Sequence, residues 1–368
     1  MTIAFILFGL FLVILILFSH VFVIYVISEI YNKRDNIIKR VLYLTLLKYI
    51  GIYMAVFIFF YLISDFLYEF IYIISFTYLG YFLNVFMFCA LYKLIVKYKK
   101  MPPLYSKIFV FIIPLVILIY SLIKAQITTF KEETLIYPGY DNSITIMHIS
   151  DMHLGTTYQK GSVEKLVEII NEKNPDVVAI TGDLSDGSQK VDSEWLKPFN
   201  TISDNVEVLY VTGNHESLYG KSEILEEIYK IRKIKHIGEK EEIMNIKGVA
   251  FIGLDYEFKD VKTKAVSILD KYGIKNNKIP TVLLYHVPKT PLKDLKEAGI
   301  FLTLAGHTHG GQIFPFTFFA WLANKYFCGL YNYENNNYIF VSSGYGTALT
   351  PMRNFSSKMI GLITIKGY

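Results

Sequence analysis

Cysteine is scarce in this sequence, which has 368 residues and only Cys89 and Cys328. One lies in an apolar segment and the other in the polar part of the chain, so we expect no disulfide between them. Two hydrolase motifs are missing, namely His-Glu-x-x-His and Gly-x-Ser-x-Gly, which excludes a zinc-protease helix and a serine nucleophile elbow. The Gly-Lys-Ser sequence at 220–222 is not a P-loop, because His215 occupies the position of its first glycine.

Charged residues are rare before residue 125, and this part of the chain accounts for the excess that raises the hydrophobic content to 53%. Each of four apolar segments can cross roughly 30 Å of hydrocarbon, which takes about 20 helical residues. The first segment lacks a basic start and is too long for a cleavable signal peptide, so we interpret it as a permanent anchor. The predicted organisation is a transmembrane helical domain over 1–128 (spans 3–27, 41–64, 70–92 and 104–123), a linker over 129–142 and a globular domain over 143–368.

The short loops between these segments differ in positive charge. Lys33, Arg34, Lys39 and Arg40 follow the first segment, and several lysines precede the fourth, whereas residues 64–69 contain no basic residue. Basic loops stay on the cytoplasmic side of a membrane. We therefore expect an integral protein of the cell membrane with its globular domain on the extracytoplasmic side.

The globular part alternates short β-branched runs with helical patterns. The runs are at 144–150, 176–181, 206–213, 281–286 and 300–307, and helical patterns cover 162–172 and 223–233. This alternation predicts an α/β fold with buried strands. No repeat of 20 to 50 residues is present, which excludes a solenoid.

Each of the five runs ends in polar residues, at the strand ends where α/β proteins gather their functional groups. Five of the eight histidines lie there, together with two aspartates and an asparagine. Oxygen and nitrogen donors without a thiolate suit Mn, Fe or Zn. Seven donors are too many for one catalytic ion and suit two ions that share a carboxylate, in a cavity that attracts phosphate. The candidate ligands are Asp151, His153, Asp183, Asn214, His286, His307 and His309.

The motifs SDMH, GDLSD, GNHE, YH and GHTHGGQ, in this order, resemble the calcineurin-like metallophosphoesterase superfamily and most of all its membrane-associated YaeI/YkuE-like branch. This resemblance implies a four-layer α/β/β/α sandwich with two mixed sheets. It also implies two divalent metal ions, manganese being favoured, with a hydroxide held between them. One ion would be bound by Asp151, His153 and His309, the other by Asn214, His286 and His307, and Asp183 would bridge them.

The resemblance also implies roles for residues that do not bind metal. His215 would protonate the leaving oxygen or stabilise the transition state, and Glu216 would orient the His215 ring. Asp186 would fix a glycine turn or a ligand histidine. Arg353 would contact the substrate phosphate.

The aromatic segment at 314–322 leaves two interpretations open: a buried helix or strand, and a lip that enters the bilayer or grips acyl chains. The leading function is a membrane-anchored phosphohydrolase, either a phosphodiesterase or a phosphomonoesterase, acting on a lipid or envelope-linked phosphoester. One alternative is a lipid-linked pyrophosphatase of the UDP-diacylglucosamine hydrolase type, which the outward orientation disfavours. Another is a receptor or transporter component with a non-catalytic phosphoesterase domain. The net charge of +5 gives no reason to expect a nucleic-acid partner.

Overall fold

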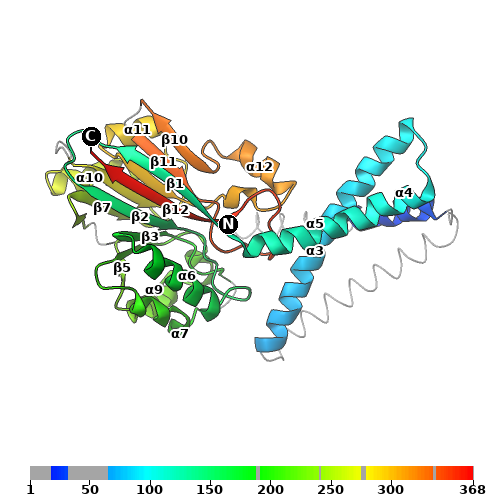
Figure 1. The fold of residues 1–368 in the computed structure, drawn as a ribbon, viewed down its shortest axis with the longest axis horizontal. Coiled ribbons are helices and arrows are strands. Elements are labelled where there is room, and N and C mark those ends of the chain that lie inside the picture. Colours follow the sequence, from blue (N-terminus) through cyan, green and yellow to red (C-terminus); the bar gives the residue numbers. More distant parts are fainter. Residues whose placement is uncertain are drawn as a thin grey trace. The chain divides into compact units, whose positions relative to one another are not determined.

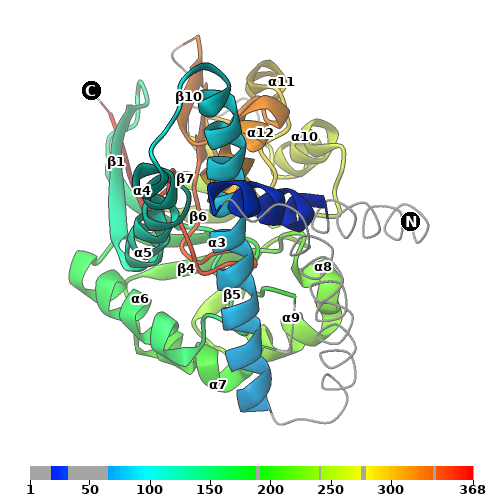
Figure 2. The same ribbon diagram turned by 90° about the vertical axis from the view of Figure 1, so that its right-hand side faces the viewer.

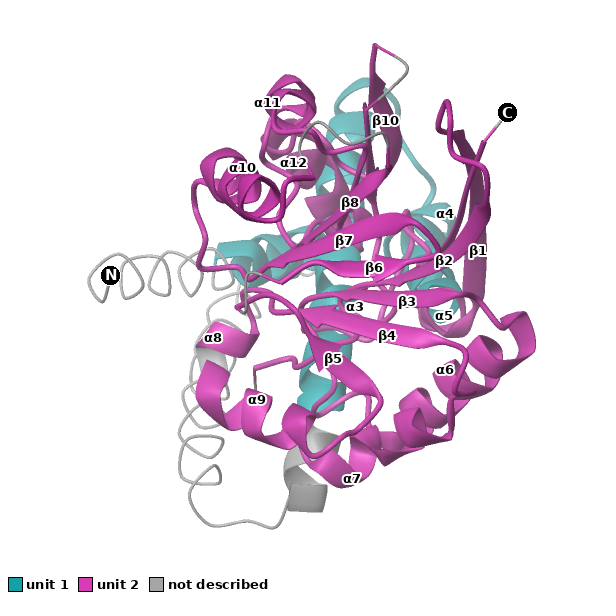
Figure 3. Cartoon of the chain, turned by 90° about the vertical axis from the view of Figure 1, so that its left-hand side faces the viewer, with its two compact units in different colours: residues 1–121 teal, residues 122–368 magenta. Residues whose placement is uncertain are grey.

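The computed structural model of the chain describes residues 18–31, 65–187, 191–239, 242–274, 279–334 and 337–367. The chain divides into two compact units, residues 1–121 and residues 122–368 (Figure 3). The first unit contains the apolar segments, and the second contains every predicted metal ligand.

The described part of unit 1 is helical. A short apolar helix covers Phe18–Ile30, and Val23, Val26 and Ile30 in it are buried with Phe82 and Val85. Two longer apolar helices, Tyr72–Tyr98 and Pro103–Gln126, have the length and composition of membrane spans. The elements are α3 (Asp65–Tyr98), α4 (Pro103–Lys107), the π-helix η1 (Ile108–Ile112) and α5 (Ile113–Gln126), whose end lies in unit 2.

These two longer helices coincide with the predicted spans 70–92 and 104–123. The predicted span 41–64 lies outside the described residues, as does most of the span 3–27. The expected number of four transmembrane helices is therefore not confirmed.

Unit 2 is built on two mixed six-stranded sheets. In the first sheet β2, β3, β4 and β5 run parallel, β12 is antiparallel to β2, and β1 is parallel to β12. Its order is β1 (Thr128–Ile136), β12 (Lys358–Lys366), β2 (Ser143–Ile149), β3 (Val177–Thr181), β4 (Glu207–Val211) and β5 (Ile234–His236).

The second sheet has a parallel centre and two antiparallel edges. Strands β11, β9, β8 and β7 are parallel, while β10 and β6 pair antiparallel at the two ends. Its order is β10 (Gly329–Tyr333), β11 (Asn337–Val341), β9 (Leu302–Ala305), β8 (Thr281–Tyr285), β7 (Val249–Leu254) and β6 (Met244–Ile246).

Three apolar clusters separate four layers. One lies between the sheets, with Ile146 and Leu209 of the first sheet packed with Phe251 and Leu284 of the second. The other two lie under the outer helices, which cover opposite faces of unit 2 (Figures 1 and 2). On the first sheet these are α6 (Lys160–Lys173), α7 (Ser193–Leu196), η2 (Lys197–Thr201) and α9 (Lys221–Tyr229); on the second they are α10 (Val261–Lys271) and α11 (Leu292–Glu297).

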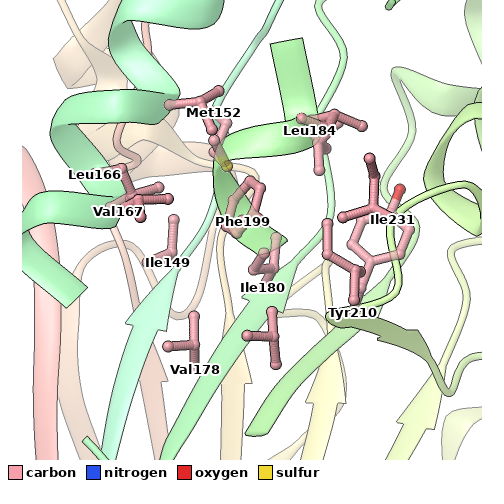
Figure 4. Close-up of a cluster of buried hydrophobic side chains, with 14 of the residues drawn as sticks. Ile149, Met152, Leu166, Val167, Val178, Ile180, Leu184, Phe199, Tyr210 and Ile231 are labelled. Atoms are coloured by element: carbon pink, nitrogen blue, oxygen red, sulfur yellow. The ribbon is translucent and has the colours of Figure 1, made fainter. Parts of the chain in front are cut away.

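Helix α6 shows how the sequence forms this layer. Its buried residues Val163, Leu166, Val167 and Ile170 have the spacing of one helix face. The helix ends at Asn174, which has a left-handed φ of 43° and whose N–H donates to the Ile170 carbonyl. Figure 4 shows part of the resulting cluster, with side chains of α6 and η2 lying over β2 and β3. The predicted α/β fold with two mixed sheets is confirmed.

In two segments the structure differs from an interpretation that the sequence suggested. Residues 129–136 of the expected linker belong to β1, which pairs with β12 along its whole length. Lys131 and Glu132 are exposed, as is usual for the edge of a sheet, so the segment looks like a linker in the sequence. The aromatic segment at 314–322 is not buried: it forms the exposed helix α12 (Phe316–Ala323).

Candidate metal centre

The predicted ligands lie just beyond the carboxyl ends of five strands, and these strands come from both sheets. The strand ends meet, because side chains from the two sheets lie within hydrogen-bonding distance of one another. Asp151 and His153 follow β2, Asp183 follows β3, Asn214 and His215 follow β4, His286 follows β8, and His307 and His309 follow β9.

Asp151, His153 and His309 form a first group of metal-capable atoms, and all three are buried. The Nε2 atoms of His153 and His309 are 2.9 Å apart, and His309 Nε2 is 3.4 Å from Asp151 Oδ1. Two neutral imidazole nitrogens at this distance repel each other if both present lone pairs. A proton or a cation between them removes that repulsion.

Asp183, Asn214, His286 and His307 form a second group. His286 Nε2 lies 3.1 Å from Asp183 Oδ2 and 3.1 Å from Asn214 Oδ1. His307 Nδ1 is 2.7 Å from the same Asn214 oxygen. The other nitrogen of His286, Nδ1, is 2.8 Å from the Thr181 carbonyl, which can only accept. The neutral His286 ring therefore has its proton on Nδ1 and its lone pair on Nε2, as a metal ligand requires.

Asp183 belongs to both groups through one oxygen. Its Oδ2 is 3.1 Å from His286 Nε2 in the second group and 3.9 Å from His153 Nε2 in the first. Its Oδ1 accepts the backbone N–H of His215 at 2.8 Å, which fixes the carboxylate plane. This position between the groups is the one that a bridging carboxylate takes in a two-metal site.

The backbone is strained at most of these residues. Non-glycine residues with positive φ are uncommon, and each costs of order 1–3 kcal/mol. Such strain persists where the surrounding structure enforces it, and it concentrates at functional sites. Five of the seven predicted ligands have a positive φ: Asp151 (52°), His153 (47°), Asp183 (50°), His307 (72°) and His309 (52°).

Two glycines of the motifs make room for the carboxylates. A Cβ at Gly213 would overlap the Asp183 carboxylate, and one at Gly306 would overlap the Asp151 carboxylate. The Asp151 carboxylate also accepts the backbone N–H of His307, with Oδ1 at 3.1 Å. Glycine at 213 and 306 is therefore a steric requirement of the two acidic groups.

The buried carboxylates need nearby positive charge. Burial raises the pKa of Asp151 to about 6. Burial also acts to raise the pKa of Asp183, but His286 and the other imidazoles outweigh it and hold that pKa well below its usual value. Burial lowers the pKa of His286, whereas the charge of Asp183 and its hydrogen bond prevail and raise it to about 10. A proton on His286 thus supplies charge that a bound cation would also supply.

The remaining imidazoles favour the neutral form. Burial lowers the pKa of His153 to about 3 and that of His307 to about 4, and it lowers the pKa of His309 well below its usual value. A neutral imidazole keeps the lone pair that binds a metal. These three rings are therefore ready to act as ligands at neutral pH.

His215 lies beside both groups, and its ring stands edge-on to His153 with centroids 4.6 Å apart. Its Nδ1 is 2.7 Å from the backbone carbonyl of Asp186, so this nitrogen carries the proton. Nε2 is then the atom free to bind or to exchange a proton. The Asp186 carboxylate accepts the N–H of Thr156, next to Gly155, and so fixes that turn.

Glu216 does not orient the His215 ring, so that part of the prediction is wrong. The glutamate is fully buried, and its carboxylate accepts three backbone N–H groups. Oε2 accepts from Gly213 at 2.6 Å and from Asp183 at 3.1 Å, while Oε1 accepts from Ser185 at 3.1 Å. Glu216, the first residue of α8 (Glu216–Tyr219), therefore ties the turn after β3 to the turn after β4.

Arg353 does not face the site as a phosphate contact, so that prediction is also wrong. The residue is fully buried, and its guanidinium donates to the carbonyls of His309 (3.3 Å), Gly344 (3.1 Å), Gly346 (2.6 Å) and Ser357 (3.0 Å). It fastens the last ligand loop to the loop after β11. No sequence pattern signals this role, because the partners are backbone carbonyls.

The donor set fits divalent cations. Among the residues that the structure describes, the carboxylates of Asp151 and Asp183 form ion pairs with imidazoles only. Oxygen and imidazole donors in two groups suit borderline divalent metals such as Mn, Fe or Zn.

Comparison with known proteins places the chain in a family. Residues 144–311 match the calcineurin-like phosphoesterase family. The chain is 34% identical to an uncharacterized metallophosphoesterase of Helicobacter pylori, over 64% of this chain and 63% of that protein. It is 31% identical to one of Aquifex aeolicus, over 61% of this chain and 85% of that protein. It is also 30% identical to a transmembrane protein with metallophosphoesterase domain of Danio rerio, over 61% of this chain and 54% of that protein.

The chain belongs to the calcineurin-like metallophosphoesterase family, as its motifs predict. It also matches the metallophosphoesterase YkuE of Bacillus subtilis at 25% identity over 254 residues, in agreement with the predicted branch. The match spans less than two thirds of the length of the Helicobacter relative.

Proposed function

We propose that this protein is a membrane-anchored phosphoesterase that uses two divalent metal ions. The position of Asp183 Oδ2, between two groups of donor atoms, is the observation that carries this proposal. Asp151, His153 and His309 would hold one ion, Asn214, His286 and His307 would hold the other, and Asp183 would be shared.

Bound cations would activate a water nucleophile and neutralise charge on the phosphoryl group. The protein's own part begins with His215, whose Nδ1–H is held by the Asp186 carbonyl. Its Nε2 would therefore be the position that exchanges a proton, and in the charged ring it would donate that proton to the departing oxygen. Glu216 holds the turn of Asp183 against the turn of Asn214 through its three backbone hydrogen bonds.

The complete donor set favours an enzyme over a domain used only for binding. A protein that needed only the fold would have no reason to maintain five strained ligand residues, each at a cost in stability. We therefore propose catalysis rather than a receptor or transporter role.

We further propose that the substrate is a lipid or envelope-linked phosphoester. Two apolar helices of spanning length precede the catalytic unit, and a relative from Danio rerio is named as a transmembrane protein. The basic loops favour an extracytoplasmic catalytic unit in the cell membrane. This orientation disfavours nucleotide-linked lipid precursors, so a mono- or diester is preferred over a pyrophosphate.

Metal content and turnover of an Asp183→Asn protein test the two-metal assignment. We expect wild type to hold two equivalents of Mn²⁺, Fe or Zn²⁺ and to hydrolyse soluble and lipid phosphoesters, and the variant to lose both properties together. Asp204→Asn is the matched control, because Asp204 lies in an exposed loop before β4. Full turnover of Asp183→Asn would remove the shared-carboxylate assignment.

A further inference from the structure

Helix α12 exposes large apolar side chains, although it follows directly on the loop of His309. Its sequence, FTFFAWLA, contains no charged residue, and no residue in it is buried. An exposed apolar patch of this kind marks an interaction site. Five side chains are between 49% and 61% exposed: Phe316, Phe318, Phe319, Trp321 and Leu322.

The helix is fixed to the metal centre. The backbone N–H of Thr317 donates to the Ile313 carbonyl at 3.1 Å, and the Thr317 hydroxyl donates to the Gly311 carbonyl at 3.3 Å. Gly311 has a φ of +67°, and a Cβ there would overlap the backbone of Thr317. The first turn of α12 is therefore packed directly on the loop that carries His309.

A second loop adds two exposed residues, Leu349 (61%) and Phe355 (68%). The Gln312 side chain donates to the backbone carbonyls of residues 348 and 350, and the Phe314 N–H donates to Asn354 Oδ1 at 2.9 Å. The rings of Phe314 and Phe355 have centroids 5.6 Å apart. These contacts join the two loops into one area, which we call the α12 surface: Phe316, Phe318, Phe319, Trp321, Leu322, Leu349 and Phe355.

The same loop is attached to the last turn of α5. Lys124 Nζ donates to the Asn354 carbonyl at 3.0 Å, and both residues belong to unit 2. Helix α5 completes the apolar stretch Pro103–Gln126, and unit 2 begins within its last turns, just before β1 starts at Thr128. Within unit 2, the end of this apolar stretch therefore lies beside the loop of Phe355.

We propose that the α12 surface inserts into the interface of the bilayer that α5 crosses. Phenylalanine and tryptophan favour that interface, and Lys124 at the edge of the surface can reach lipid headgroups. The inference rests on the membrane anchoring in the proposed function. It adds that the metal centre is held at the headgroup level by α12 itself and not by the anchor alone.

Tryptophan fluorescence tests the insertion, because the chain contains only Trp195 and Trp321. The full-length protein is reconstituted in phosphatidylcholine vesicles whose acyl chains do or do not carry bromine, which quenches tryptophan on contact. A Trp321→Phe protein retains Trp195, which packs against the buried cluster under α6 and serves as the internal control. The difference between the two proteins isolates the emission of Trp321.

Strong quenching of Trp321 by brominated lipid, with Trp195 unaffected, is the expected result. Quenching by aqueous iodide instead would place Trp321 in water and overturn the proposal. Protection from both quenchers would also overturn it, because Trp321 would then be covered by protein, either the N-terminal helices or a second copy of the chain.

A pair of variants separates this proposal from the proposed function. Phe319→Asp should abolish most of the lipid quenching of Trp321, whereas Tyr272→Asp, an exposed aromatic at the end of α10, should not. Both variants should hydrolyse a soluble chromogenic phosphodiester at the wild-type rate. If lipid quenches Trp321 in the wild type but no phosphoester is hydrolysed, the proposed enzymatic function is refuted and the membrane insertion is supported. If the wild type hydrolyses phosphoesters but lipid does not quench Trp321, the insertion is refuted and the enzymatic function is supported.

Discussion

The three backbone hydrogen bonds of Glu216 make Glu216→Gln a sharp test of how the metal centre is held together. The substitution preserves shape but replaces one carboxylate oxygen with an NH₂ group, which cannot accept. Glu216 is fully buried, so water cannot replace the missing acceptor. Burial and the nearby charge of Asp183 raise the pKa of Glu216, while the N–H groups of Ser185 and Gly213 lower it.

The size of the effect follows from the geometry. A glutamine oxygen at the Oε2 position keeps the bonds from Asp183 and Gly213, and the NH₂ group then faces the Ser185 N–H. One charged hydrogen bond is lost, and the Ser185 N–H then faces an NH₂ donor and has no acceptor. Each of these terms is about 1–3 kcal/mol, so we expect a loss of about 3 kcal/mol in the free energy of unfolding. Looser turns at Asp183 and Asn214 should also weaken metal binding by about 10- to 100-fold.

Urea unfolding of the full chain in detergent, in the presence of a chelator, measures the first effect. Tryptophan fluorescence is a suitable signal, because both tryptophans lie in unit 2. Titration with Mn²⁺ measures the second effect. Glu164→Gln is the control, because Glu164 forms an exposed ion pair with Lys160 on the surface of α6. An unchanged unfolding midpoint together with unchanged Mn²⁺ affinity would refute the role assigned to Glu216.

Three further predictions concern the supports around the centre. Arg353→Lys cannot reproduce the planar set of donors to four carbonyls, so it should weaken Mn²⁺ binding by about 10-fold while saturating Mn²⁺ restores turnover. Burial lowers the pKa of Lys358 to about 8, so between about pH 8 and 10.5 the folded state binds fewer protons than the unfolded state. The free energy of unfolding of the wild type should therefore rise over that pH range by up to about 3 kcal/mol. Lys358→Met should remove this rise and should be more stable than the wild type at pH 7. An identical pH dependence of urea unfolding in the two proteins would contradict this. Gly346→Ala would place a Cβ against the Met152 carbonyl and should lower both Mn²⁺ affinity and the unfolding midpoint, whereas Gly161→Ala, where nothing lies near, should not.

The strands of the fold could be predicted where burial is complete. Strands such as β3 and β8 are covered on both faces, so their sequences are uninterrupted apolar runs. Strand β1 could not be found in this way, because Lys131, Glu132 and Glu133 interrupt its apolar residues at the sheet edge. Its pairing with β12 also joins residues far apart in the chain. Its existence depends on a partner that lies about 230 residues further on.

The ligand positions could be predicted for a related reason. Strand ends are visible in the sequence, and the topology of an α/β sandwich brings them together. The roles of Glu216 and Arg353, which hold the ligand loops in place, could not be predicted. Glu216 accepts from backbone N–H groups, and Arg353 donates to backbone carbonyls. Any residue type offers the same backbone groups, so the sequence contains no pattern that identifies these contacts.

The segment at 314–322 shows where a rule for soluble proteins fails. An uncharged aromatic stretch is usually buried, since exposing it to water costs about 25 cal/mol per Å² of apolar surface. In this structure the stretch is exposed, and the neighbouring Leu349 is exposed with a strained φ of +60°. The loop of strained ligands leads directly into it at Gly311. Two consecutive segments therefore depart from what favours stability: the ligand loop has strained backbone angles, and the aromatic segment exposes apolar side chains. Such departures are expected where function rather than stability determines the structure. If the proposed insertion of α12 takes place, a bilayer would remove the cost of exposing the aromatic segment. Bound cations would likewise offset the backbone strain of the ligand loop, and the two segments would then act as parts of one site.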